Sequence, residues 1–360
     1  MKICFLAGAD SIHSKRWIEY FVKEGSEVHW ISLTPSSFGE IKDIKFYLLR
    51  QFSSKLLDII FNIISFRKLI RKIKPNILHA HYAGVNGVIA ALSGFHPFII
   101  TAWGSDILIA TKSKAVKILI KFALKRADLI TTDGYNIKEA IINLGIMPKK
   151  IKIIRTGVDV QKFCPGSKNK ELEKRLEISD CHVIISLRNF DPIYDVGTLI
   201  RAIPLILKEF PTAKFIIGGK GSEEQKLKKM AKSLIFFDSI KFIGCISNNE
   251  LPKYLRIADI YISTSLSDGG LAASTAEAMA CELPIVITDS GDNKKWVEDK
   301  KNGFVVPIKN PKILAEKIIY LLKNKDKRKN FGKVNRKIIE GKYNYCKEME
   351  KMEKIYRTLI

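Results

Sequence analysis

The sequence predicts an α/β protein built from two domains, each with a doubly wound parallel sheet. A chain of 360 residues is longer than one hydrophobic core usually supports. Short apolar runs alternate with helical patterns along the chain, which is typical of β-α-β units and a mostly parallel sheet. A polar stretch at residues 165–170 interrupts this alternation. We therefore expect two Rossmann-like domains that face each other across a ligand-binding cleft.

The predicted elements follow in order along the chain. In the first half they are the runs at residues 2–6, 14–24, 27–33, 77–80, 84–92, 98–101, 127–131 and 151–154. In the second half they are the runs at residues 182–187, 198–209, 214–218, 223–232, 241–243, 249–258, 260–263, 274–280 and 284–288. From residue 325 the chain is charged and helical. These runs predict domains at residues 1–165 and 175–340, and a helix at 341–360 that packs back toward the first domain.

Composition excludes several classes of protein. A hydrophobic content of 46% describes a folded globular chain rather than a disordered or fibrous one. The six cysteines form no Cys-x-x-Cys pair, so neither a disulfide framework nor a zinc site is indicated, and we expect a cytoplasmic protein. The apolar run at residues 3–9 is short for a signal peptide and fits a first buried strand. No run of about 18 apolar residues predicts a membrane span.

The net charge of +24 points to an anionic partner. Segment 44–74 carries basic residues at positions 45, 50, 55, 67, 68, 71, 72 and 74 against the acid Asp58, interleaved with large apolar residues. This composition predicts a basic amphipathic surface helix or helix pair. In segment 112–126, Lys114, Lys117, Lys121 and Lys125 share one helix face. Both segments fit an anionic membrane surface; the alternative is the solvated face of ordinary helices.

Segment 263–280 combines a strand, a Gly-Gly loop and the start of a helix. Backbone N–H groups at Gly269, Gly270, Leu271 and Ala272 can bind an anion or sugar hydroxyls, because the first turn of a helix leaves its amides unpaired. Glu277 lies on this helix among apolar neighbours and can accept hydrogen bonds from two vicinal hydroxyls. The segment is therefore a candidate site for a nucleotide ribose and its phosphates.

The motifs together resemble glycosyltransferase family 4, also called glycosyl transferases group 1, a retaining family with the GT-B fold. The run at residues 277–286 with Asp289 and the run at 302–307 carry the likeness to the donor-binding signature. Further matching stretches are 13–17, 79–82, 103–106, 157–159, Phe163, Pro165, Arg188, 218–221 and 242–244. The resemblance covers nearly the whole chain and implies two Rossmann-like domains and a nucleotide-sugar donor.

The resemblance implies roles on the donor side. Glu277 matches the second glutamate of the family's Glu-x7-Glu motif, a ligand of the donor ribose, whereas the first falls on Gly269 and leaves Asp268, one residue out of register, as the nearest acid. Arg188 fits the arginine that holds the diphosphate, Tyr194 stands where the family has a lysine, and Lys220 is the candidate second cation. Gly8, which permits close backbone approach after the first strand, and Gly244 complete the expected donor set.

The acceptor side is predicted in the N-terminal domain. Trp103 stands where many relatives carry a histidine near the reacting sugar, and an indole can stack on a sugar face. Asp106 is the nearest acid and a candidate contact of acceptor or sugar. His13, Trp17 and His81 are further candidates, with packing at strand ends as the alternative.

These expectations define a function. The resemblance implies retaining transfer of a hexosyl or N-acetylhexosaminyl group from a nucleotide sugar, with a UDP-sugar favoured, to a saccharide or lipid-linked acceptor in surface polysaccharide or glycolipid synthesis. No Asp-x-Asp motif occurs, so we expect neither a metal nor another cofactor. The alternatives are an epimerase or phosphorylase of the same fold, or a non-catalytic protein that binds anionic lipid or nucleic acid. No nucleic-acid module is recognisable, and no such partner is expected.

Overall fold

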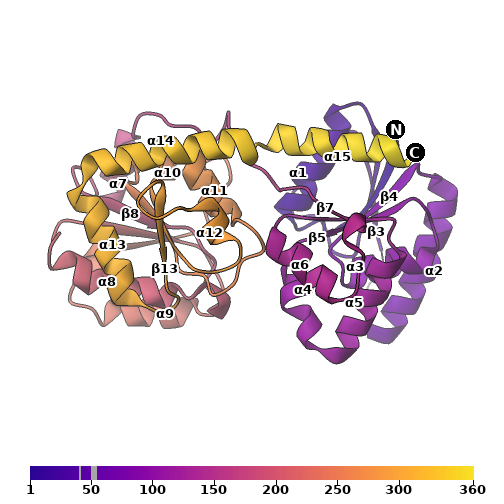
Figure 1. Ribbon diagram of the computed structural model, residues 1–360, viewed down its shortest axis with the longest axis horizontal. Helices are drawn as coiled ribbons and strands as arrows, with labels where there is room; N and C mark the ends of the chain where they lie inside the picture. The colour runs from indigo at the N-terminus through magenta and orange to yellow at the C-terminus, as the bar shows by residue number, and fades with distance from the viewer. Residues whose placement is uncertain (40–41, 50–54) are drawn as a thin grey trace. The chain divides into compact units, whose positions relative to one another are not determined.

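The computed structural model describes residues 1–39, 42–49 and 55–360, which divide into two compact units (Figure 1). Unit 1 comprises Met1–Thr156 and the C-terminal segment Cys346–Ile360, and unit 2 comprises Gly157–Tyr345. The division falls ahead of the polar stretch at residues 165–170, and α7 (Lys170–Leu176) begins at the end of that stretch.

Unit 1 is a parallel sheet covered by helices. Its seven described strands are β1 (Lys2–Leu6), β2 (Glu27–Ser32), β3 (Ile44–Leu48), β4 (Ile77–His81), β5 (Phe98–Ala102), β6 (Leu129–Thr132) and β7 (Ile151–Ile153). They pair in the order β3-β2-β1-β4-β5-β6-β7, and every pairing is parallel. The side chains of β4 and β5 are buried along their whole length. Strands covered on both faces appear in sequence as continuous apolar runs, so the apolar runs between the helical patterns predict these strands.

The helices of unit 1 follow the strands. They are α1 (Ile12–Lys23), α2 (Lys55–Ile73), α3 (Val85–Ser93), α4 (Ser105–Leu108), α5 (Lys114–Arg126) and α6 (Tyr135–Asn143), with the 3₁₀ turns η1 (Ala110–Lys112) and η2 (Pro148–Lys150). The C-terminal helix α15 (Tyr345–Leu359) belongs to this unit from its second residue onward. Its Tyr356 is buried, lies 4.8 Å from the Phe21 ring and shares a hydrogen bond with His79 on β4.

The prediction of a basic amphipathic helix or helix pair over residues 44–74 is wrong in its first part. Residues 44–48 form the edge strand β3, paired in parallel with β2. Ile44, Phe46 and Tyr47 favour a strand, and the alternation of apolar and basic side chains fits a period of two as well as a helical period. The second part does form helix α2. Arg50 and Phe52 of this prediction lie outside the described residues.

Unit 2 has the same architecture as unit 1. Its described residues form a six-stranded parallel sheet covered by helices. Its strands are β8 (Val183–Ser186), β9 (Lys214–Gly218), β10 (Ile240–Gly244), β11 (Ile260–Ser263), β12 (Ile285–Thr288) and β13 (Gly303–Val306), in the order β10-β9-β8-β11-β12-β13. Its other helices are α8 (Val196–Leu207), α9 (Glu224–Lys232), α10 (Leu251–Ile257), α11 (Ala273–Ala280), α12 (Asn293–Trp296), α13 (Pro311–Lys323) and α14 (Lys325–Lys342), with the turns η3 (Pro192–Tyr194) and η4 (Phe237–Ser239).

Two buried clusters cover the two faces of the second sheet. One contains Phe215, Ile262 and Phe304, and the other contains Ile185, Tyr261 and Ile285. Alternate residues of a strand point to opposite faces, so one sheet supplies both cores. The prediction of two doubly wound parallel α/β domains is confirmed.

The chain crosses from one unit to the other twice, after Thr156 and after Tyr345. The two crossing segments are hydrogen-bonded to each other. Val158 donates a backbone hydrogen bond to Tyr343, and Tyr345 donates one to Val158. Gly157 has a φ of 67°, and a Cβ on it would lie 2.5 Å from the Cα of Tyr345. Glycine is needed here because the two passages approach each other so closely.

Candidate donor site and acceptor-side cluster

The strand order of unit 2 reverses between β8 and β11, and the two predicted donor residues Arg188 and Asp268 lie there. Arg188 follows β8, and Asp268 follows β11, which pairs directly with β8. Ligands of open parallel sheets bind outside the carboxyl ends of the strands at such a reversal. The topology of the sheet therefore brings together two residues that are 80 positions apart in sequence.

Arg188 and Asp268 form a buried ion pair. Nη2 of Arg188 donates to Oδ1 of Asp268, and each residue is only 8% exposed. Burial disfavours a charged guanidinium, but Asp268, with Tyr261 and Tyr194, outweighs it, and the pKa of Arg188 rises above its ordinary value. The ring of Tyr194 lies 4.5 Å from the guanidinium carbon. Tyr194 thus contributes a cation–π contact at the position where the family carries a lysine.

Two other nitrogens of the guanidinium have no short hydrogen bond within the described residues. Nη1 makes a long contact of 3.5 Å to Oγ of Ser274, and Nε is buried without a hydrogen-bond partner among the described residues. A buried donor without a partner costs about 1–3 kcal/mol. An anionic oxygen placed beside these nitrogens would relieve that cost.

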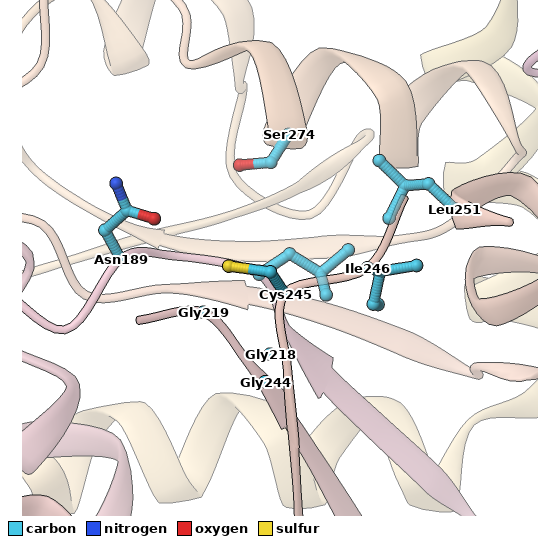
Figure 2. A pocket seen from close by; sticks show the side chains of 9 residues that line it. Asn189, Gly218, Gly219, Gly244, Cys245, Ile246, Leu251 and Ser274 are labelled. Carbon is cyan, nitrogen blue, oxygen red and sulfur yellow. The ribbon is translucent and has the colours of Figure 1, made fainter. Parts of the chain in front are cut away.

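A cavity of about 160 Å³ lies at the carboxyl ends of β8, β9 and β10 and the start of α11, and the two sequence neighbours of Arg188 line it (Figure 2). Figure 2 shows Asn189 on one side of it and Leu251 on the other. Its lining consists of Leu187, Asn189, Gly218, Gly219, Gly244, Cys245, Ile246, Leu251 and Ser274. Apolar walls with a few polar groups are typical of small-molecule sites. Gly244, the stretch 218–221 and the segment with Ser274 were predicted from the sequence, whereas Leu187, Asn189, Cys245, Ile246 and Leu251 were not; the first four of these follow β8 or β10 within three residues.

Two glycines hold the Lys220 loop against the strand end that carries Arg188. A Cβ on Gly219 would lie 2.4 Å from the carbonyl oxygen of Arg188, and one on Gly221 would lie 2.5 Å from the carbonyl carbon of Phe190. The N–H of Phe190 donates to the carbonyl of Lys220. Lys220 is exposed on this loop, so the two predicted cations lie on segments in direct backbone contact.

Helix α11 begins beside the same cavity. Its N-cap residue Ala272 offers no side chain to the first amides, which remain for a ligand. Gly270, with φ at 81°, turns the chain into this helix. Glu277 is 6% exposed and lies three residues after Ser274, so the two side chains share a helix face. Ser274 lines the cavity, and Glu277 lies one turn further along α11.

Four of the five predicted acceptor-side residues form one aromatic cluster in unit 1. The ring of His13 stacks on that of Trp103 at 5.6 Å, and His81 meets Trp17 at 5.2 Å and Trp103 at 5.4 Å. Trp17 and His81 are fully buried, whereas His13 and Trp103 are half-buried. The latter two are therefore the members placed to touch a ligand.

The histidines of this cluster are neutral near pH 7. Burial, followed by the charge of Arg16, lowers the pKa of His13 to about 4, and burial lowers the pKa of His81 to about 3. Nδ1 of His13, Nε2 of His81 and Nε1 of Trp17 are buried without a hydrogen-bond partner in the described part of the chain. The cluster thus carries polar ring atoms and no charge.

Asp106 lies in the interior and holds a loop. Its carboxylate accepts backbone hydrogen bonds from Ala83 at 2.7 Å, Gly104 at 2.9 Å and Trp103 at 3.1 Å. Burial raises its pKa, and these hydrogen bonds oppose the rise. These contacts fix Trp103 in the cluster. Gly8, the remaining predicted donor residue, follows β1 in unit 1, where a Cβ would lie 2.7 Å from Oδ1 of Asp10.

Two features are absent from the described ranges 1–39, 42–49 and 55–360. No helix there is long and apolar enough to cross a bilayer. No group of three or more His, Cys, Asp or Glu side chains there is arranged to hold a metal ion.

Comparison with known families matches both halves of the chain. Residues 167–338 match the family described as glycosyl transferases group 1, and residues 2–134 match the family described as glycosyl transferase 4-like.

Known proteins resemble the chain at low identity. Spore coat protein SA of Bacillus subtilis is 25% identical over 243 residues, 64% of each chain, so the match spans less than two thirds of that relative. The UDP-Gal:alpha-D-GlcNAc-diphosphoundecaprenol alpha-1,3-galactosyltransferase of Escherichia coli is 24% identical over 315 residues, 83% of this chain and 79% of that one.

A solved structure extends the likeness to the whole fold. Anabaena Alr3699/HepE in complex with UDP-glucose superposes with a TM-score of 0.85 at 18% identity, covering 100% of both chains. The two family matches, one over each half of the chain, confirm the resemblance drawn from the motifs: the chain belongs to the glycosyl transferase group 1 and glycosyl transferase 4-like families.

Proposed function

We propose that this protein is a retaining glycosyltransferase that moves a hexosyl or N-acetylhexosaminyl group from a nucleotide sugar, with a UDP-sugar favoured, to a saccharide or lipid-linked acceptor. The observation that carries the proposal is the buried guanidinium of Arg188, whose Nε has no hydrogen-bond partner among the described residues and whose neighbours Leu187 and Asn189 line a cavity at the uncapped start of α11. A nucleoside diphosphate fits this combination, because the cavity accepts an apolar ring and the cation accepts phosphate oxygens.

Each donor residue has a place in this proposal. Arg188, with Lys220 on the adjoining loop, stabilises the charge that the diphosphate gains as it leaves. Glu277 accepts hydrogen bonds from the ribose hydroxyls. The amides of residues 269–272 and the backbone at Gly244 contact the phosphates and the base. Asp268 holds Arg188 through Nη2, which places its effect on the arginine rather than on the sugar.

The proposed reaction is a transfer with retention of the anomeric configuration. The acceptor hydroxyl oxygen forms the new bond to the anomeric carbon on the face that the diphosphate leaves. The bond from that carbon to the diphosphate oxygen breaks, its electron pair stays on the diphosphate, and the hydroxyl proton passes to a phosphate oxygen. Double displacement would need a carboxylate nucleophile, and the sequence offers no convincing candidate.

The names of relatives support the donor and acceptor classes. The Escherichia coli relative is named for a UDP-galactose donor and a diphosphoundecaprenol acceptor, and the superposed Anabaena structure contains UDP-glucose. We extend both classes to this chain and propose surface polysaccharide or glycolipid synthesis as the setting. The protein would act in the cytoplasm, peripherally on an anionic membrane face reached through segment 44–74 or segment 112–126.

A thermal-shift screen across UDP-, GDP- and ADP-sugars tests the proposal, since a ligand that binds only the folded state raises Tm. We expect UDP-sugars to give the largest rise and Glu277→Ala to remove most of it. Glu316→Ala, which changes an exposed glutamate on α13, is the matched control and should behave as wild type. A wild-type protein whose Tm responds to none of the nucleotide sugars would refute the assignment and return attention to a non-catalytic basic protein.

A further inference from the structure

The start of helix α5 projects from unit 1. All side chains from Lys112 to Leu119 are exposed. A helix that lies on a sheet buries a side chain at every third or fourth position, and α5 does so only at Ile120, Ala123 and Leu124. Its first two turns therefore extend beyond the core, whereas Ala110 of the preceding turn η1 packs against the core. We call residues 109–119 the projecting segment.

The projecting segment presents large apolar side chains to solvent. Ile118 is 69% exposed, Leu119 51%, Ile109 44% and Val116 36%. Single exposed apolar residues are common on soluble proteins, but a group of them on one protrusion marks a surface that contacts an apolar partner. Because these side chains surround the first turns of α5, packing within unit 1 does not account for them.

The same segment is basic and contains no acid. Lys112, Lys114 and Lys117 are exposed on it, and no Asp or Glu occurs from residue 107 to residue 127. The flanking acids do not offset this charge, since Asp106 is buried and Asp128 pairs with His96. Lysines interleaved with exposed Ile, Leu and Val side chains are typical of helices that lie in the interface of an anionic bilayer.

The projecting segment stands at the sheet edge that carries the acceptor-side cluster. It follows Trp103 through the short helix α4, and α5 packs beside α3, which follows β4. Tyr82 and Val85, at the carboxyl end of β4, are also exposed, and the hydroxyl of Tyr82 shares a hydrogen bond of 3.2 Å with that of Ser105 at the start of α4. The exposed apolar residues thus gather on the segments that follow β4 and β5.

We propose that unit 1 docks on an anionic lipid bilayer through the projecting segment, with Ile118 and Leu119 entering the acyl boundary and Lys112, Lys114 and Lys117 binding lipid phosphates. The proposal rests on the proposed function for its purpose, since docking at this edge brings His13 and Trp103 to the membrane surface where a lipid-linked acceptor is held. It selects the projecting segment over segment 44–74 as the docking surface.

Sedimentation of the full-length protein with vesicles tests the docking. The vesicles are phosphatidylcholine alone, or phosphatidylcholine mixed with phosphatidylglycerol. We expect the wild type to pellet with the mixed vesicles only. The triple variant Lys112→Gln, Lys114→Gln, Lys117→Gln should bind them on the order of 100-fold more weakly, from about 1 kcal/mol per lysine near the surface. The double variant Ile118→Gln, Leu119→Gln keeps the charge and should also lose binding.

A matched charge change on α2 is the control. Lys68→Gln, Arg71→Gln, Lys72→Gln removes three exposed basic residues from the other basic segment, and it should pellet as the wild type does. Equal loss in the two triple variants, or loss in the α2 variant alone, would overturn the choice of segment. Wild-type binding by the Ile118 and Leu119 double variant would overturn the insertion. A change in oligomeric state of that double variant without vesicles would reassign the surface to self-association.

Failure of the docking and failure of the proposed function give different results. The α5 variants should retain the thermal shift with a UDP-sugar, because the changed residues lie outside the donor site. Normal nucleotide binding without vesicle binding would refute the docking alone. Vesicle binding by a wild type that binds no nucleotide sugar would refute the proposed function and leave the docking in place.

Discussion

The side chains of Arg188 and Asp268 form a buried ion pair across the reversal of strand order in the second sheet, and Nε of the guanidinium is buried without a hydrogen-bond partner among the described residues. Asp268 therefore has two opposing effects on an anionic ligand of Arg188. It orients the guanidinium, and it adds a negative charge to the site. Substitutions at Asp268 separate these effects.

Asp268→Asn should bind UDP at least as tightly as the wild type, because the amide oxygen still accepts the hydrogen bond from Arg188 while the negative charge is gone. Asp268→Ala should bind about tenfold or more weakly than Asp268→Asn, since a hydrogen bond to a charged group contributes about 1.5–3 kcal/mol. Titration calorimetry with UDP measures both, and uridine, which has no phosphate, is the control ligand. Equal UDP affinities for the Asn and Ala variants would contradict the anchoring of Arg188 by Asp268.

The proposed contact between Glu277 and the ribose predicts a loss of affinity only for nucleotides that carry the ribose hydroxyls. Glu277→Gln should weaken binding of UDP by about tenfold, because a carboxylate that accepts two hydroxyl hydrogen bonds is replaced by an amide with one acceptor oxygen. The same substitution should change the affinity for 2′,3′-dideoxy-UDP little, since that ligand lacks the hydroxyls. Competition binding with both nucleotides checks this. A parallel loss for the two ligands would place Glu277 away from the ribose.

Gly219 offers a test of the Lys220 loop. Gly219→Ala should displace the loop and lower the free energy of unfolding by about 1–3 kcal/mol, because φ is 150° and the added Cβ would lie 2.4 Å from the carbonyl oxygen of Arg188. Gly25→Ala is the control, since Gly25 also has a positive φ, of 74°, but nothing lies within 4 Å of its Cβ position. Urea unfolding measures both variants. A Gly219→Ala variant no less stable than Gly25→Ala would show that the close approach is easily relaxed.

The buried histidines predict a pH dependence of stability. Because the pKa values of His13 and His81 in the folded protein are about 4 and about 3, the unfolded chain binds more protons as the pH falls below about 6.5. The free energy of unfolding is then highest above pH 6.5. Below that pH it decreases by about 1.4 kcal/mol per pH unit for each histidine, until the pH reaches the pKa of that histidine in the folded protein.

Urea unfolding between pH 7 and pH 5 measures this slope. In His81→Gln the slope should be smaller by the share of one histidine. Identical slopes for wild type and His81→Gln would contradict a neutral His81 in the folded protein.

The sequence was sufficient for the fold and for part of the site. Buried parallel strands such as β9 appear as continuous apolar runs, and Glu277 stands in a helix start whose motif is local. The strand at residues 44–48 was missed because its apolar and basic residues fit either period. The pairing of Arg188 with Asp268 depends on two strands becoming neighbours, and the cavity lining depends on three strand ends. Neither follows from spacing along the chain.

The return of α15 to unit 1 determines the order in which the molecule is completed during synthesis. The backbone N–H of Arg155 donates to Glu348 at 2.9 Å, and His79 pairs with Tyr356, so unit 1 lacks these partners until residues 346–360 leave the ribosome. The residues of unit 2, Gly157–Tyr345, are all synthesised before that segment. A version of unit 1 made alone would therefore need residues 1–156 joined to residues 346–360, and a nascent chain stalled at residue 345 would expose the surface of unit 1 that awaits its last helix.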